Sequence, residues 1–180
     1  MSQLVTAGAL RAALATPGLK LLDATYYLPN EDKDAQALFA AGHIPGARFF
    51  DVDAVADHST GLPHMLPSPE AFAATMAGLG ISSADRVVVY DQRGIFSAPR
   101  LWWMLRVFGH DNVSVLDGGL PGWVAAGHPV QAGEPAAAAP GDFNAAYRGQ
   151  MVRGLDDMRR NLETQAALVL DARAAGRFDA

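Results

Sequence analysis

A loop between an apolar strand and an aromatic-rich helix is the first place in this sequence where chemistry could occur. Residues 87–103 read VVVYDQRGIFSAPRLWW, and the loop begins at Asp91. Backbone N–H groups at the start of a helix bind anions, and such a loop often holds a nucleophile as its anion. The chain contains no cysteine, and a carboxylate is a weak nucleophile. We therefore expect Asp91 to be structural, accepting backbone N–H bonds or pairing with Arg93 or Arg100.

The aspartates of the segment DVDAVADHSTG, residues 51–61, are the other group of potential ligands. This segment fails the EF-hand pattern for calcium, because Val55 and Ala56 occupy its fifth and sixth positions and no glutamate closes the loop. The five histidines show no HxH or HExxH spacing, and the absence of cysteine excludes cysteine-ligated zinc. The glycine-rich LDGGLPGW lacks the Lys-Ser/Thr of a P-loop. We expect neither a metal nor a cofactor.

Alternating strands and helices must position Asp91 and the aspartates of 51–61. Continuous β-branched runs predict buried strands, and Ser68 before Pro69 and Glu70 marks the start of a helix. The expected strands lie within 19–24, 47–50, 85–91 and 112–119, and the expected helices within 5–14, 68–79, 98–108 and 120–127. This alternation predicts an α/β fold with a mostly parallel sheet of four or five strands flanked by helices.

The pattern is interrupted after the last of these helices. Alanine, proline and glycine without periodicity predict a linker at 131–150, between a first domain, 1–130, and the start of a second, 151–180. A shift of 148 positions aligns the two ends of the chain, matching Leu14 with Leu162, Leu22 with Leu170, Asp23 with Asp171 and Ala24 with Ala172. Because helix and strand recur at one fixed shift, we expect an incomplete internal repeat.

Composition excludes several classes of partner. The 180 residues are 50% hydrophobic and carry a formal charge of -5, and the 14 basic residues form no lysine or arginine stripe, so we expect no nucleic-acid partner. No apolar run approaches the roughly 18 residues of a membrane span, and the N-terminus lacks the pattern of a signal peptide. We expect a cytoplasmic protein without a membrane partner.

Several motifs together resemble those of the tandem-domain rhodanese family, the thiosulfate and 3-mercaptopyruvate sulfurtransferases. They occur in the family's order and cover nearly the whole chain: GHIPGARFFDVD, PHMLPSPEAF, VVVYD followed by SAPRLWWMLRVFGH, VSVLDGGLPGW and VLDARAAGRF. The resemblance implies two rhodanese-like α/β domains facing each other across a cleft, with the catalytic cysteine only in the second. Asp91 then occupies the equivalent position of the non-catalytic copy, and the nucleophile lies beyond residue 180.

The resemblance also implies an activity and three site residues. The parent protein would transfer sulfane sulfur from 3-mercaptopyruvate or thiosulfate, through a cysteine persulfide, to a thiol or cyanide. Asp53 and His64 correspond to a family pair that tunes proton transfer beside the second domain's site; alternatively, Asp53 caps a turn and His64 makes a local hydrogen bond. Arg177 corresponds to an arginine that binds the anionic substrate.

Two interpretations of the whole chain remain. In the first, the chain is the non-catalytic part of a sulfurtransferase and is inactive alone. Exposed apolar residues of its incomplete second domain, Val169, Leu170 and Phe178, would then favour association with another chain. In the second, the chain is a cysteine-free rhodanese-like module that binds or scaffolds a partner.

Overall fold

The computed structural model describes residues 3–172 and 175–178 and divides the chain into two compact units, Met1–Arg148 and Gly149–Ala180. The strands of the first unit are β1 (Leu4–Val5), β2 (Leu19–Asp23), β3 (Ala47–Phe49), β4 (Arg86–Tyr90) and β5 (Val113–Leu116). Its helices are α1 (Ala7–Ala13), α2 (Ala35–Ala41), α3 (Pro69–Gly78), α4 (Ala98–Val107) and α5 (Gly119–Ala125), with a 3₁₀ turn at Pro29–Glu31.

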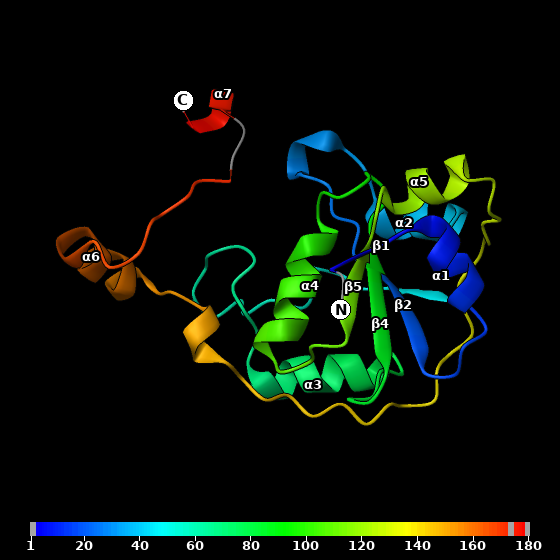
Figure 1. The fold of residues 1–180 in the computed structure, drawn as a ribbon, viewed down its shortest axis with the longest axis horizontal. Coiled ribbons are helices and arrows are strands. Elements are labelled where there is room, and N and C mark those ends of the chain that lie inside the picture. Colours follow the sequence, from blue (N-terminus) through cyan, green and yellow to red (C-terminus); the bar gives the residue numbers. More distant parts are fainter. Residues whose placement is uncertain (1–2, 173–174, 179–180) are drawn as a thin grey trace. The chain divides into compact units, whose positions relative to one another are not determined.

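The five strands form one parallel sheet in the order β1-β5-β4-β2-β3 (Figure 1). β4 lies at its centre, and its residues from Val87 to Tyr90 are all buried. Both faces of a parallel sheet are covered, which explains the continuous apolar run of this strand. The register pairs Asp23 at the end of β2 with Tyr90 at the end of β4, so the loops that follow both strands leave the same edge of the sheet.

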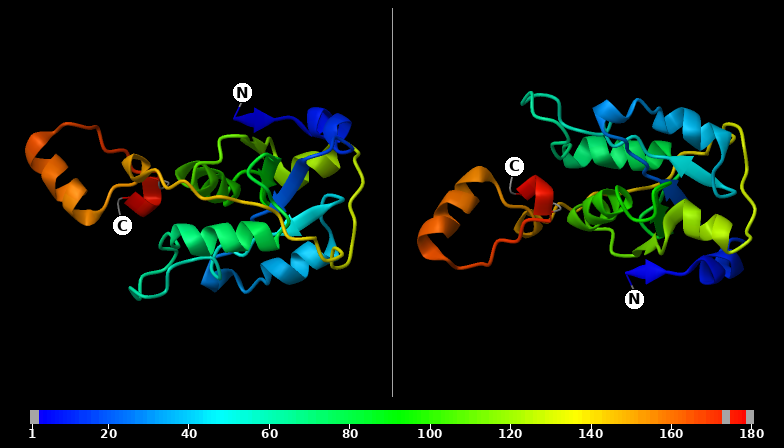
Figure 2. Two further views of the ribbon diagram at one scale, coloured as in Figure 1. Left: turned by 90° about the horizontal axis from the view of Figure 1, so that it is seen from below. Right: turned by 90° about the horizontal axis from the view of Figure 1, so that it is seen from above.

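Helices cover both faces of the sheet (Figure 1 and Figure 2). Leu10 of α1, Phe39 of α2 and Trp123 of α5 pack into the core on one face. Phe72 of α3 and Leu101 of α4 belong to the larger core on the other face. The predicted α/β fold with a parallel sheet flanked by helices is therefore confirmed.

Two elements of the first unit were not predicted. β1 has only two residues and pairs with β5 at the edge of the sheet, where it is too short for a periodic signal. α2 begins inside a charged stretch, where Asp34 caps the helix by accepting a hydrogen bond of 2.9 Å from the Ala37 N–H. Asp34 is a favoured N-cap residue, and this local role accounts for one of the charges.

The segment 131–148, part of the predicted linker, has little regular structure. It is nevertheless held against the rest of the first unit by hydrogen bonds and a buried side chain. Gln131 exchanges two backbone hydrogen bonds with His43. The side chain of Phe143 is buried against Phe72 in the larger core, with ring centroids 5.8 Å apart. At the end of the segment the Arg148 guanidinium makes two hydrogen bonds of 2.7 Å with the carboxylate of Asp111. These contacts place 131–148 within the first unit.

The second unit contains α6 (Leu155–Thr164) and α7 (Ala175–Phe178), after a 3₁₀ turn at Gly149–Met151. The side chain of Asn161 both donates to and accepts from the backbone of Ala167. Within this unit the described residues form no strand, because strand pairing needs a neighbour that they do not supply. Throughout the described chain, no helix has both the length and the apolar character needed to span a bilayer.

Candidate functional site

The loop after β4 is held by the carboxylate of Asp91, which is fully buried. One oxygen, Oδ1, accepts the Arg93 N–H at 2.9 Å. The other, Oδ2, accepts three N–H groups at the start of α4, from Phe96 at 2.7 Å and from Ser97 and Ala98 at 2.9 Å each. These are the donors that an anion at a helix N-terminus would use, and here the chain's own carboxylate occupies them.

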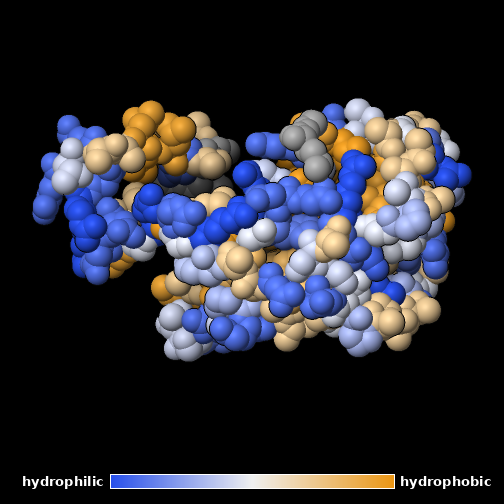
Figure 3. Space-filling view, turned by 60° about the horizontal axis from the view of Figure 1, so that its bottom comes forward, coloured by the Kyte–Doolittle hydropathy of each residue, from blue (hydrophilic) through white to orange (hydrophobic). Residues whose placement is uncertain are grey.

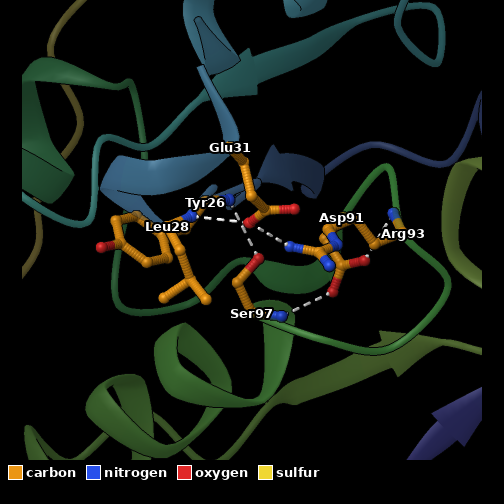
Figure 4. Close-up of polar contacts among 6 residues, drawn as sticks. All are labelled: Tyr26, Leu28, Glu31, Asp91, Arg93 and Ser97. Carbon is orange, nitrogen blue, oxygen red and sulfur yellow. Dashed lines mark hydrogen bonds and ion pairs between the residues drawn. The ribbon is translucent and has the colours of Figure 1, made fainter. Parts of the chain in front are cut away.

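A second loop, after β2, is bonded onto the Asp91 loop (Figure 4). The Glu31 carboxylate accepts the Leu28 N–H at 2.7 Å and a guanidinium N–H of Arg93 at 2.8 Å. The Leu28 hydrogen bond and the nearby Arg93 charge hold the pKa of Glu31 below its usual value. Ser97 Oγ accepts the Tyr26 N–H at 3.1 Å. The two loops therefore form one polar network at the carboxyl edge of the sheet.

A buried carboxylate, Asp23, underlies this network. It accepts both the backbone N–H, at 2.9 Å, and the hydroxyl of Thr25. Thr25 Oγ1 accepts the Gln92 N–H at 2.9 Å, and Asp23 Oδ2 accepts a side-chain N–H of Gln92 at 3.3 Å, so Asp23 is coupled to the Asp91 loop both through Thr25 and directly. Burial raises the pKa of Asp23, against the effect of its hydrogen bonds, and burial also raises the pKa of Tyr90. In the sequence, Asp23 stands out only as the end of a predicted strand and as a matched position of the predicted repeat.

Asp53 and His64 lie together although a proline- and glycine-containing loop separates them in sequence. Nδ1 of His64 is 2.9 Å from Oδ1 of Asp53, which is an ion-pair distance, although the two atoms are not aligned as a hydrogen bond. The Tyr26 ring meets the His64 ring edge-on, with centroids 5.0 Å apart. Asp51 caps this turn, because its Oδ1 accepts the N–H groups of Asp53 and Ala54. The carboxylate of Asp53 is thus available to orient the imidazole.

A cavity of about 270 Å³ lies beside this pair, and burial of Arg100 in its wall lowers the pKa of that side chain. The cavity is lined by Tyr26, Val52, His64, Phe96, Ser97 and Arg100. An imidazole next to a carboxylate can exchange a proton, so this corner has a group for acid-base chemistry. No group of side chains suited to holding a metal occurs among the described residues.

Arg177 belongs to α7, but its side chain lies outside the described residues. The role expected for Arg177 is therefore left as a prediction. The second unit has exposed apolar side chains beside hydrophilic ones (Figure 3). The most exposed of them are Leu155, Leu162, Leu168, Val169, Leu170 and Phe178.

A family model described as "Rhodanese-like domain" matches residues 6–126. The chain is 45% identical over 190 residues to thiosulfate/3-mercaptopyruvate sulfurtransferase 1, mitochondrial, of Arabidopsis thaliana, covering 94% of this chain and 50% of that protein. It is 45% identical to the 3-mercaptopyruvate sulfurtransferase of Rattus norvegicus and 43% identical to that of Escherichia coli (strain K12), covering 96% and 91% of this chain and 58% of each relative. The chain thus spans between half and three fifths of the length of these curated relatives.

Solved structures give the same result for the fold. The crystal structure of SseA from Escherichia coli, described as a 3-mercaptopyruvate sulfotransferase, matches with a TM-score of 0.94 and 40% identity over 100% of this chain and 69% of that chain. The Tum1 protein from Saccharomyces cerevisiae matches with a TM-score of 0.87 and 29% identity over 98% of this chain and 62% of that chain.

Proposed function

The chain belongs to the rhodanese family, and from that premise we propose that it forms the cysteine-free first domain of a sulfurtransferase. The reaction moves sulfane sulfur from 3-mercaptopyruvate or thiosulfate to a cysteine outside residues 1–180, and then from the persulfide to a thiol acceptor. The relatives named above, at 43% and 45% identity, support this activity. The observation that carries the inactive role is the Asp91 carboxylate, which takes up the N–H donors that a reactive thiolate would need.

Asp53 and His64 are proposed to assist this reaction by proton transfer. With 3-mercaptopyruvate as donor, a thiolate attacks the donor's sulfur, the C–S bond breaks, and the enolate of pyruvate takes up a proton. Asp53, 2.9 Å from Nδ1, orients the imidazole. Nε2 of His64 is then the nitrogen that exchanges the proton.

We propose that the second unit begins a second rhodanese copy and that Arg177 binds the anionic donor. The match of Asp23-Ala24 with Asp171-Ala172 at a constant shift supports the repeat. A guanidinium grips a carboxylate or a sulfur oxyanion through two parallel N–H donors, which suits both proposed substrates. Replacing Arg177 by Gln in an active protein should therefore raise KM more than it lowers kcat.

We also propose that the protein is cytoplasmic and that it associates with itself. The exposed side chains of Leu168, Val169 and Leu170 support association through the second unit. Sedimentation of residues 1–180 should give a larger species than residues 1–148, and equal monomeric behaviour of both would contradict it. Cell fractionation tests the location.

Sulfide release tests the activity. The 180-residue protein should release no sulfide from 3-mercaptopyruvate in the presence of a dithiol. Joining residues 1–180 to the part of the Escherichia coli relative that they do not cover should restore turnover, because that fusion spans the length of a named 3-mercaptopyruvate sulfurtransferase. Turnover by the 180-residue protein alone, or a folded but inactive fusion, would contradict the proposal.

The same fusion tests the proton-transfer pair. His64→Gln should lower kcat by about 100-fold, the contribution typical of a general acid or base. His58→Gln is a matched control, because His58 is an exposed histidine of the same loop. Equal activity of the two variants would refute a role for His64.

A further inference from the structure

Arg100 is a half-buried cation that the proposed reaction leaves without a role. It lies in the first turn of α4, and its guanidinium carbon is 4.9 Å from the centre of the Trp103 ring. None of the ion pairs among the described residues includes Arg100, and its Nε has no hydrogen-bond partner within that part of the chain. Burying a cation without a counter-ion is costly. The contacts that Arg100 does make therefore indicate its role.

The main polar contact of Arg100 is with the backbone of His64. A guanidinium N–H, on Nη2, donates to the carbonyl oxygen of His64. His64 has a φ of 56°, in the left-handed region that residues with a Cβ rarely adopt. Such a conformation persists only where the surroundings hold it. Arg100, fixed on a helix, supplies that constraint from outside the loop.

The backbone of His64 decides where its imidazole lies. The ring branches from the Cα next to the carbonyl group that Arg100 binds. Its Nδ1 lies 2.9 Å from the Asp53 carboxylate, and its centroid lies 5.0 Å from that of the Tyr26 ring. Ser97, the residue before α4, also holds Tyr26 through its Oγ. The start of α4 therefore anchors the backbone of both aromatic residues.

We propose that Arg100 is a positioning residue that holds the His64 backbone so that the imidazole meets Asp53. Its importance for turnover rests on the function proposed above, whereas the positioning itself does not. A contact between a long side chain and a backbone carbonyl is independent of the type of residue at 64. Arg100 thus constrains the loop while leaving the His64 ring nitrogens to Asp53 and to a proton partner.

The NMR signals of the His64 ring in the 180-residue protein test this proposal directly. His64→Gln assigns these signals, and Tyr26→Leu defines the part of their chemical shifts that comes from the Tyr26 ring. Arg100→Met should abolish that part, and Arg100→Lys, which keeps one donor group, should restore some of it. Retention of the full Tyr26-dependent shift in Arg100→Met would overturn the proposal.

Arg106→Met is the matched control for packing. Arg106 lies on the same helix, with its guanidinium carbon 5.0 Å from the Trp102 ring centre, but its charged partner is Asp111. This variant should leave the His64 signals unchanged, and a change equal to that of Arg100→Met would overturn the proposal. Unchanged amide signals from β4 would show that the variants are folded.

Activity gives a separate readout in the fusion protein. Arg100→Met should lower kcat with little change in KM, and combining it with His64→Gln should cause no further loss, because both changes remove one function. An additive loss would overturn the link between Arg100 and His64. Since the NMR experiment needs no turnover, an inactive fusion would count against the proposed function and not against the positioning.

Discussion

Replacing Asp91 by Asn tests whether its charge is what holds the loop after β4. The asparagine has almost the same shape, but it offers one acceptor oxygen in place of two and it carries no charge. In the best orientation its carbonyl oxygen keeps the N–H groups of Phe96, Ser97 and Ala98 that the structure gives to Oδ2. Its NH₂ group then faces the Arg93 N–H, which Oδ1 accepts in the native loop. One buried donor is thereby left opposite another donor.

The expected loss of stability follows from these contacts. Leaving a buried N–H unsatisfied costs about 1–3 kcal/mol. Removing a buried negative charge from a helix N-terminus costs about a further 1–2 kcal/mol. The free energy of unfolding should therefore fall by roughly 2–5 kcal/mol. At about 2–4 °C for each kcal/mol in a domain of this size, the midpoint of thermal unfolding should fall by roughly 4–20 °C.

Urea unfolding followed by tryptophan fluorescence measures this loss. Asp34→Asn is the matched control, because Asp34 caps α2 through a single exposed hydrogen bond and asparagine caps equally well. The control should unfold within about 0.5 kcal/mol of the native chain. If Asp91→Asn were as stable as Asp34→Asn, the carboxylate would not be the group that holds the loop.

Three further changes test other parts of the structure. Burial raises the pKa of Asp23 above its ordinary 3.8. The protonated carboxyl group therefore stabilises the fold fully below the pKa of the unfolded chain, and this contribution is lost as pH rises through the pKa of the folded chain. Asp23→Asn has no such titration and should gain in unfolding free energy relative to the native chain as pH rises above 3.8, measured by urea unfolding at several pH values. Phe143→Ala should cost about 3–5 kcal/mol, because Phe143 is buried in the main core, and a loss below 1 kcal/mol in urea unfolding would show that 131–148 is dispensable. A Cβ on Gly119 would come within 2.4 Å of the Asp91 carbonyl oxygen, whereas one on Gly127 would meet nothing within 4 Å, and both have positive φ. Gly119→Ala should therefore lower the thermal midpoint clearly more than Gly127→Ala.

The positions of the strands, and which of them are buried, could largely be predicted, because local sequence determines both. The β-branched run of β4 is buried on both faces, and this is the pattern that a central parallel strand requires. The start of α3 could also be predicted from nearby residues, since the Ser68 side chain accepts the Ala71 N–H one turn later. The segment 131–148 could not be placed in this way. Its order comes from hydrogen bonds to distant backbone, such as that of Ala146 to Phe108, which leave no periodic pattern.

The site was predictable only where a single loop forms it. Asp91 accepts N–H groups from the residues that follow it, so its role could be inferred from the strand, loop and helix alone. The distance between Asp53 and His64 could not be inferred, because it depends on a loop that Arg100 holds from another element. Asp23 was missed for the same reason, since it contacts Gln92, which follows another strand, both through Thr25 and through a direct hydrogen bond of 3.3 Å from Gln92 Nε2.

The occupation of the α4 N-terminus by Asp91 also determines how the first unit responds to oxidants. A thiolate among such donors is the form of cysteine that peroxide oxidises and electrophiles alkylate. A carboxylate undergoes neither reaction, and this chain contains no cysteine elsewhere. The first unit can therefore keep its loop intact under oxidative conditions that would inactivate a thiolate-bearing copy. Cysteine oxidation in a protein built from both would be confined to the copy that bears the thiolate.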